Sequence, residues 1–418
     1  MAGLPQVIII GGGFAGLDAA RRLRKVPCDV TIIDRHNHHV FQPLLYQVAT
    51  AGLSPGDIAS PIRWILRKQQ RVRTLLANVE HIDSTAKTIQ LDHGQTLAYD
   101  YLIVAAGATH SYFGHDDWAR AAPGLKTLDD ALAIRRRLLL AFEEAEREPN
   151  PVYQRRLLTF VLIGGGPTGV ELAGALGEIA RQALRSEFDA VDPAIARIIL
   201  IEAGPFILPS FPTDLRESAR RALLRLGIDV RVGRAVTRIE EGAVWIGDER
   251  IEAHTILWAA GVAAAPLARD LGPGLDRAGR VIVEPDLSVP GHPGVFVAGD
   301  LASFSHQTGK PLPGVAQVAK QGGRHAAANV ARLIAGQKTK AFRYIDPGNL
   351  ATIGRNAAIA DFGFMHVSGY LGWLLWLFVH ITFLIGFRNR ASVMLQWAAA
   401  YLTYQRSVRL ITGRPPAG

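Results

Sequence analysis

A glycine-rich turn that occurs twice, each time between an apolar strand and a helix, constrains the fold more than any other feature. The first copy is the run Gly11-Gly12-Gly13-Phe14-Ala15-Gly16, which follows a strand predicted over residues 6–10. Gly11 allows the tight turn, Gly13 lets a pyrophosphate approach the backbone, and Gly16 lets the helix pack closely on the strand. The N–H groups and the dipole at the start of that helix favour phosphate. The turn therefore predicts a dinucleotide site.

An acidic residue at the end of the next strand completes this fingerprint, because glycine-rich turns alone occur in many folds. The strand predicted over residues 29–33 ends at Asp34. The Asp34 carboxylate can accept a hydrogen bond from a ribose hydroxyl. Strand, turn, helix and acidic strand end together predict a complete βαβ unit.

The same pattern occurs again in the middle of the chain. A strand over residues 159–163 precedes the run Gly164-Gly165-Gly166-Pro167-Thr168-Gly169, and the next strand ends at Glu202. Glu202 lies well beyond the usual offset of about 20 residues, so the polar segment 185–193 is interpreted as an insertion. No Arg or Lys follows Glu202 before Arg216. A 2′-phosphate would meet a carboxylate without a nearby cation, which favours NADH over NADPH.

Three further apolar strands end in small residues, which let the backbone pass close to a ligand. These ends are Ala106-Gly107, Ala260-Gly261 and Gly299-Asp300. We predict an α/β fold with two Rossmann-like dinucleotide-binding domains, the second inserted into the first, and a C-terminal membrane-associating helical segment. The expected boundaries are 1–112 and 276–341 for the first domain, 113–275 for the second and 342–418 for the C-terminal segment.

Charge and the C-terminal sequence predict attachment to a membrane surface. The chain has 46 Lys and Arg against 37 Asp and Glu, and this net charge of +9 favours nucleic acid or an anionic membrane as partner. The sequence carries no nucleic-acid motif, which argues against nucleic acid. Segment 370–387 has no Asp, Glu, Lys or Arg, which favours a membrane. As a helix it would run roughly 27 Å, just short of a ~30 Å hydrocarbon core. Aromatic and basic residues follow it, as in an interfacial helix: Arg388, Arg390, Trp397, Tyr401, Tyr404, Arg406 and Arg409.

These residues resemble the flavoprotein superfamily with two dinucleotide-binding domains, in which the first site holds FAD and the second NAD(P)H. Within it the chain looks most similar to the type II NADH dehydrogenases, the single-subunit NADH:quinone oxidoreductases, over nearly its whole length. The matching runs are residues 11–17, 41–49, 164–172 and 316–321, and the run around His380 that ends at Arg390. In this family the Ala-Gln-x-x-x-Gln element, here at 316–321, lies beside the flavin where quinone binds.

The resemblance implies FAD as cofactor, NADH as substrate and a membrane quinone as acceptor. It also favours monotopic attachment. Because Met1–Pro5 lead directly into a strand, we expect no signal peptide and a protein on the cytoplasmic face of the inner membrane. Pattern and resemblance together assign cofactor contacts to Gly11, Gly13, Phe14, Ala15, Gly16, Asp34, Arg35, Ala106, Gly107, Gly299, Asp300, Ala316 and Gln317 for FAD, and to Gly164, Gly166, Gly169, Glu202, Ala260 and Gly261 for NADH.

Three residues are candidates for the chemistry. Glu171 matches the place where the family keeps a carboxylate close to flavin and nicotinamide, and the alternative is a helix-end carboxylate favoured by the helix dipole. Gln317 and Gln321 are four residues apart, so on a helix they share a face that could address a quinone carbonyl. The alternative for this pair is an exposed polar face.

The histidine and cysteine content argues against two other chemistries. His36, His38 and His39 lack the cysteines or clustered carboxylates of a metal site, so we predict no metal and a solvated loop over the FAD adenosine. Cys28 is the only cysteine, so no redox disulfide can form. We expect it to be a small packed side chain, which leaves direct transfer from flavin to acceptor.

Two other functions stay open at this point. One is a soluble NADH-dependent reductase of a protein acceptor such as ferredoxin, with the C-terminal run as a dimer interface. The other is a nucleotide-sensing protein that holds FAD and NADH without turnover. A homodimer is compatible with each of these functions.

Overall fold

The computed structural model describes residues 3–185, 187–272, 274–403 and 408–412, which belong to two compact units. The first unit comprises Met1–His39, Ala59–Thr109 and Val262–Pro347, and the second comprises Val40–Ile58, His110–Gly261 and Gly348–Gly418. The second unit is inserted in the first between Thr109 and Val262. It also takes in segment 40–58 and the C-terminal region, which the expected boundaries place elsewhere.

A six-stranded sheet forms the centre of the first unit, in the order β20-β21-β9-β1-β2-β5. All neighbouring strands pair in parallel except β20 and β21. Parallel strands are covered on both faces and therefore need continuous apolar sequence. The apolar runs at residues 6–10 and 29–33 form such strands, so both predictions are confirmed. The strands are β1 (Gln6–Ile10), β2 (Asp29–Asp34), β5 (Val72–Leu76), β9 (Tyr101–Val104), β20 (Ser288–Val289) and β21 (His292–Val297).

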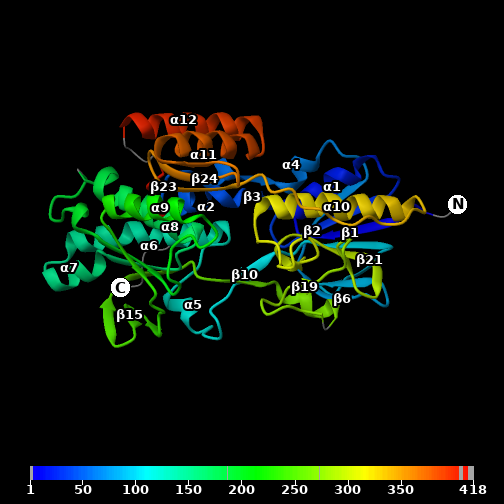
Figure 1. The fold of residues 1–418 in the computed structure, drawn as a ribbon, viewed down its shortest axis with the longest axis horizontal. Helices are drawn as coiled ribbons and strands as arrows, with labels where there is room; N and C mark the ends of the chain where they lie inside the picture. The colour runs from blue at the N-terminus through cyan, green and yellow to red at the C-terminus, as the bar shows by residue number, and fades with distance from the viewer. Residues whose placement is uncertain (1–2, 186, 273, 404–407, 413–418) are drawn as a thin grey trace. The chain divides into compact units, whose positions relative to one another are not determined.

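Two helices of the first unit, α1 (Phe14–Arg22) and α10 (Ala316–Ile334), lie side by side (Figure 1). They approach closely because small residues line the contact. A Cβ atom on Gly323 would lie only 2.1 Å from the carbonyl oxygen of Ala15. Ala15 and Ala319 also pack with Ala105 and Ala298, which lie at the ends of strands β9 and β21. The start of α10 is thereby held near the glycine-rich turn.

The second unit is centred on a four-stranded parallel sheet in the order β13-β12-β11-β17. Its strands are β11 (Thr159–Ile163), β12 (Arg197–Glu202), β13 (Ile228–Val232) and β17 (Thr255–Trp258). The strand predictions for residues 159–163 and 197–201 are confirmed. Helix α8 (Pro167–Glu178) follows β11 directly, as the glycine-rich turn predicts.

A C-terminal antiparallel sheet of β23 (Asn349–Gly354), β24 (Ala357–Asp361) and β25 (His366–Ser368) also belongs to the second unit. It lies between α8 and α9 (Thr213–Arg225) on one face and α11 (Gly369–Phe383) on the other (Figure 1). Two glycines permit the close contact. A Cβ atom on Gly174 would lie 1.7 Å from the carbonyl oxygen of Ile353, and one on Gly372 would lie 2.6 Å from that of Ala358.

The apolar C-terminal segment forms a shorter helix than the predicted 370–387. Helix α11 ends at Phe383, and Gly386 adopts a φ of 93° that a continuing helix cannot have. Helix α12 (Phe387–Thr403) then begins after this turn. None of the helices in the described residues is long and apolar enough to cross a membrane.

The contact between α8 and the C-terminal sheet gives a test of the second unit's packing. Replacing Gly174 by Ala should lower the free energy of unfolding by about 1–3 kcal/mol, because the new methyl group meets the backbone of Ile353. Gly177→Ala, three residues along the same helix, is the matched control. Its Cβ atom would make ordinary contacts at 3.5 Å, so it should be neutral or stabilise by up to about 1 kcal/mol. Urea unfolding measures both, and equal effects would contradict the packing described.

Candidate functional site

The glycines of the first turn have the geometry of a phosphate cradle. Gly11 has a φ of 100°, and a Cβ atom on it would lie 2.2 Å from the carbonyl oxygen of Ala105. A Cβ atom on Gly16 would lie 1.8 Å from the carbonyl oxygen of Gly11. At Gly13, by contrast, no described atom lies within 4 Å of such a Cβ atom. The turn is closed around Gly11 and Gly16 and leaves space at Gly13, where α1 begins.

Asp34 at the end of β2 is tied to this turn. Its carboxylate accepts hydrogen bonds from the backbone N–H of Gly12 at 2.5 Å and from that of His36 at 2.7 Å. Burial raises the pKa of Asp34, but the hydrogen bonds from His36 and Gly12 outweigh it and leave the pKa below its ordinary value. A carboxylate has about four acceptor positions, so Asp34 can still accept a ribose hydroxyl.

The second turn repeats this construction. Gly164 has a φ of 113°, and a Cβ atom on Gly169 would lie 1.9 Å from the carbonyl oxygen of Gly164. At Gly166 no described atom lies within 4 Å of the Cβ position. The Glu202 carboxylate accepts hydrogen bonds from the N–H groups of Gly165 and Gly204, both at 2.6 Å. The long insertion therefore leaves Glu202 in the position that Asp34 has in the first turn.

Strand pairing places another residue, Arg234, beside the backbone of Glu202. Strand β13 is parallel to β12 and pairs Val232 with Glu202. Two residues later, the backbone N–H of Arg234 donates to the carbonyl oxygen of Glu202 at 3.3 Å. Strand pairing therefore brings the backbone of a residue distant in sequence next to Glu202, while the Arg234 guanidinium lies 3.9 Å from the carboxylate of Glu249.

The small-residue strand ends divide between the two units. In the first unit Gly107 and Gly299 have φ values of 72° and 78°, which favour glycine. Asp300 follows Gly299 and lies beside Gly314, whose Cβ position is 3.4 Å from a carboxylate oxygen of Asp300. In the second unit a Cβ atom on Gly261 would clash with the ring of Phe113 at 2.6 Å. The other predicted cofactor contacts lie at the starts of helices α1 and α10 or just after strands β2, β9 and β17. They are Phe14, Ala15, Arg35, Ala106, Ala260, Ala316 and Gln317.

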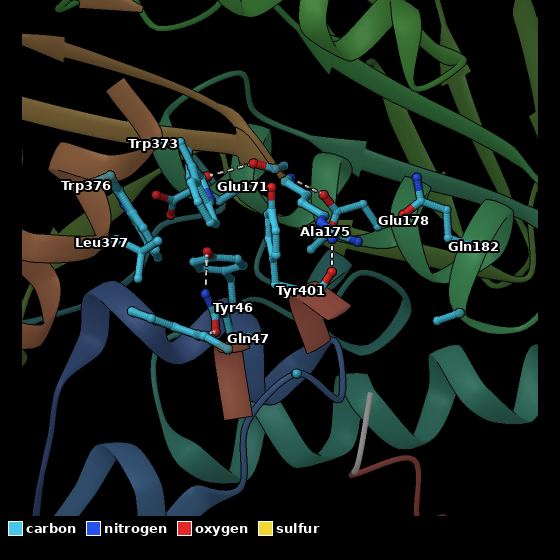
Figure 2. A pocket seen from close by; sticks show the side chains of 16 residues that line it. Tyr46, Gln47, Glu171, Ala175, Glu178, Gln182, Trp373, Trp376, Leu377 and Tyr401 are labelled. Carbon is cyan, nitrogen blue, oxygen red and sulfur yellow. Dashed lines mark hydrogen bonds between the residues drawn. The ribbon is translucent and has the colours of Figure 1, made fainter. Parts of the chain in front are cut away.

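A pocket of about 130 Å³ lies within the second unit. Aromatic and apolar side chains from three helices form much of its lining (Figure 2). Helix α11 contributes Trp373, Trp376 and Leu377, α2 (Leu45–Ala49) contributes Tyr46, and α12 contributes Tyr401. The pocket suits a flat molecule that is largely apolar, since the rings offer a large contact area, while Glu171, Glu178 and Arg355 add polar groups to the lining.

Hydrogen bonds and ring contacts fix this lining. The Trp397 indole N–H donates to the Gln47 side-chain oxygen at 2.8 Å, and the Gln47 amide donates to the Tyr46 hydroxyl at 2.8 Å. Trp376 stacks on His380 with ring centroids 4.3 Å apart. Burial lowers the pKa of His380 to about 4, so this imidazole is neutral and acts as a packing residue. The C-terminal helices and segment 40–58 therefore form one wall.

Glu171 is the carboxylate with the most perturbed acidity in this pocket. It lies in the first turns of α8 and lines the pocket. Burial raises its pKa to about 8, and a hydrogen bond from the backbone of Thr352 opposes the shift without cancelling it. Near neutral pH the group is therefore a protonated carboxylic acid, which can donate a proton. A plain helix-end carboxylate would instead have a lowered pKa.

The two glutamines share a face of α10 in the first unit but have different surroundings. The Gln321 amide donates to the carbonyl oxygen of Ile345 at 2.8 Å and accepts from the Ile345 N–H at 3.0 Å. Both ends of this side chain are thus bonded to backbone. Gln317 is half-buried, one turn closer to the start of the helix. Glu171 belongs to the second unit, so the three candidates do not share one unit.

The structure also shows how the histidine and cysteine side chains singled out above are placed. Cys28 is buried and its thiol is free, which confirms a packed side chain. The loop after Asp34 is not solvated throughout, because the His39 side chain is only 3 % exposed. Among the described residues, no three His, Cys, Asp or Glu side chains are arranged to hold a metal ion.

Comparison with known proteins identifies the family. The family model for pyridine nucleotide-disulphide oxidoreductases matches residues 5–323, and the model for the NDH2 C-terminal domain matches residues 347–406. A type II NADH:quinone oxidoreductase of Mycobacterium tuberculosis is 44 % identical over 97 % of this chain and 90 % of its own length. A second such protein from that organism is 43 % identical over 99 % of this chain and 91 % of its own length.

The chain belongs to the type II NADH:quinone oxidoreductases. The fold agrees with this family: the structure of NDH2 from Plasmodium falciparum in complex with NADH superimposes with a TM-score of 0.87, at 20 % identity, and the match covers 98 % of this chain and 100 % of that one. A ferredoxin reductase from Rhodopseudomonas palustris matches less well, with a TM-score of 0.66 over 86 % of this chain and 81 % of its own, at 19 % identity. At such identities the two structures bear on the fold alone.

Glu202 gives a test of the second dinucleotide site of this family member. We expect Glu202→Gln to narrow the preference for NADH over NADPH in kcat/KM by about 10-fold, or ~1.4 kcal/mol. The change removes a negative charge that would face a 2′-phosphate. Glu241→Gln, at an exposed carboxylate, is the control and should change nothing. An unchanged ratio in Glu202→Gln would show that this carboxylate does not meet the ribose.

Proposed function

We propose that this chain catalyses the oxidation of NADH by quinone, with FAD held by the first unit and NADH by the second. The observation that supports this most strongly is the identical construction of the two turns, each closed by an acidic strand end. When bound, FAD supplies the hydride-accepting and electron-donating chemistry that no side chain can supply. The protein's own contribution is to bind, orient and supply protons.

Residues of the first unit fit the FAD pyrophosphate and ribose. The open space at Gly13 admits a phosphate, the N–H groups at the start of α1 face it, and Asp34 accepts from the ribose. In the second unit Gly166 leaves space for a phosphate of NADH, the start of α8 offers N–H groups, and Glu202 offers an acceptor for the ribose. We propose Asp300 and Gln317 as further contacts to FAD, on the family resemblance.

The aromatic pocket of the second unit is the proposed quinone site. Quinones are flat, apolar and short of hydrogen-bond donors, which suits a lining of Trp373, Trp376 and Tyr401. Reduction of a quinone by two electrons also takes up two protons. Glu171, protonated near neutral pH, can donate one of them. Both glutamines belong to the first unit, so their assignment to a quinone carbonyl stays a prediction from the sequence, and Gln321 is bonded to backbone at both ends of its side chain.

The identity of the electron acceptor is the decisive test of this function. Enzyme reduced with NADH in the absence of oxygen should regain its yellow colour on adding a short-chain quinone, and not on adding ferredoxin. Colour that returns only with ferredoxin would favour the protein-acceptor reductase. A flavin that NADH fails to bleach would favour the sensor. Stopped-flow absorbance measures the rates.

Proton donation by Glu171 predicts a pH dependence. Its pKa is about 8, so the acid form is present below that pH and is lost above it, and quinone reduction should slow as pH rises through 8. Glu171→Gln should slow this step on the order of 100-fold and remove the titration. Glu178→Gln, at another carboxylate of the pocket, is the control that should keep it. A titration that persists in Glu171→Gln would assign it to another group.

We further propose that α11 and α12 attach the protein to the cytoplasmic face of the inner membrane. Helix α11 buries Gly372, Trp376 and His380, which are spaced by four residues, and exposes apolar side chains on its other face. Exposed apolar patches of this kind indicate an interaction surface. The exposed residues are Tyr370, Leu371, Leu374 and Phe378 on α11, and Met394 and Leu395 on α12.

Two of the basic residues in this region are held in place by backbone carbonyl groups. The Arg390 guanidinium donates to the carbonyl oxygens of Leu384 and Thr382, both at 2.8 Å. Arg409 donates to the carbonyl oxygen of Ala183 at 2.8 Å. These two arginines are therefore held by the protein. The Arg388 side chain, Tyr404 and Arg406 lie outside the described residues, and a homodimer remains a prediction.

Attachment through the apolar face can be measured with liposomes. The double variant Leu371→Ser, Phe378→Ser should lose most flotation with phosphatidylglycerol vesicles, because both side chains are more than half exposed and contribute apolar area. Val152→Ser, at an equally exposed apolar residue on another helix, should float like the unchanged protein. Retained flotation of the double variant would contradict this face as the attachment surface.

A further inference from the structure

Both dinucleotide turns hold the carbonyl group of their middle glycine, and each uses a different donor. In the first unit the ring Nδ1 of His39, on β3 (His38–Val40), lies 3.1 Å from the carbonyl oxygen of Gly12. In the second unit the backbone N–H of Leu208 donates to the carbonyl oxygen of Gly165 at 2.7 Å. Each donor follows shortly after the acidic strand end. In both turns the carbonyl group of the middle glycine is therefore held by a hydrogen bond, from a side chain in the first unit and from the backbone in the second.

This restraint fixes the direction of the next N–H group. A trans peptide unit is planar, so the carbonyl of Gly12 and the N–H of Gly13 point in opposite directions. His39 holds the carbonyl on one side, and the Gly13 N–H consequently points away from His39. The N–H of Gly12 is held by Asp34, so the Gly12 backbone is fixed on both sides. Without the His39 bond, the Gly12–Gly13 peptide would lose the restraint on its carbonyl group.

The surroundings of His39 define its tautomer. A carbonyl oxygen only accepts, so Nδ1 must carry the proton and donate it. The other ring nitrogen, Nε2, is buried and has no hydrogen-bond partner among the residues that the structure describes. The ring packs edge-on against Phe14, with centroids 4.9 Å apart. Burial lowers the pKa of His39 to about 4, so a neutral donor persists through the physiological range.

Leu208 shows that the corresponding restraint in the second unit is kept at a cost. Its φ of 51° lies in the left-handed region, which is strained for a leucine. The side chain is completely buried. The strained residue is thus the one whose N–H donates to the Gly165 carbonyl. Strain at such a position indicates a functional requirement for the bond.

We infer that His39 is a positioning residue of the first dinucleotide site, whose Nδ1–H holds the Gly12–Gly13 peptide so that the Gly13 N–H faces the FAD pyrophosphate. This inference rests on the proposed function, because it requires FAD at the first turn. It assigns no contact between His39 and the cofactor. Loss of the donor should weaken FAD binding through the backbone of the turn.

The test compares three variants at this position. His39→Asn keeps an amide donor at the place of Nδ1, whereas His39→Gln moves the donor to the place of Nε2 and His39→Leu removes it. Dilution of each holoenzyme, followed by the rise in flavin fluorescence, gives the Kd for FAD. We expect about a 10-fold weaker Kd for His39→Leu and for His39→Gln, and a change within about 2-fold for His39→Asn.

Each outcome bears on the inference. Equal Kd values for FAD in the unchanged protein, His39→Leu and His39→Gln would overturn it. It would also be overturned if His39→Asn bound FAD as weakly as His39→Leu, because the ring would then act by packing alone. If His39→Leu fails to fold, as judged by circular dichroism, the comparison of the Kd for FAD between His39→Gln and His39→Asn decides whether the donor matters. Unchanged protein that binds no FAD would instead overturn the proposed function. NADH binding to the second unit should be the same in all variants.

Discussion

The rest of the structure depends on one hydrogen bond made twice, from the N–H of a middle glycine to the carboxylate that ends the second strand of each βαβ unit. Gly12 donates to Asp34 and Gly165 donates to Glu202. The bond joins the turn after the first strand to the end of its neighbour, so the start of the helix is fixed relative to the sheet. The same carboxylate keeps acceptor capacity for a ribose, so one group serves both fold and ligand.

The second unit carries a further layer on this core. Its α8 has the dinucleotide turn at one end and, at Gly174, lies in direct contact with the backbone of β23. The C-terminal sheet can approach only because that position lacks a side chain. Burial against this layer changes the acidity of Glu171 from that of an ordinary carboxylate to that of a proton donor near neutral pH. The packing of the C-terminal sheet on α8 therefore also sets the pKa of Glu171 in the pocket.

Much of the candidate site follows from local sequence. The strand ends at Asp34 and Glu202 could be predicted because strands buried on both faces are apolar throughout and stop at the first polar residue. Three other features could not be predicted from the chain. The backbone of Arg234 meets that of Glu202 through strand pairing, His39 is buried inside a polar stretch, and segment 40–58 joins the second unit. Each depends on residues far apart in sequence.

The sequence by itself determined two dinucleotide-binding units, their acidic strand ends and the family, because these are properties of short runs with fixed spacing. Tertiary structure alone decided which face of α11 is buried. That helix is apolar all round, so its pattern cannot distinguish a face. Contact with the sheet at Gly372 selects one, and Trp376 on the same face packs against Trp397 of α12. Tertiary structure likewise decided the acidity of Glu171 and the restraint by His39, since burial and hydrogen bonds are properties of the packed chain.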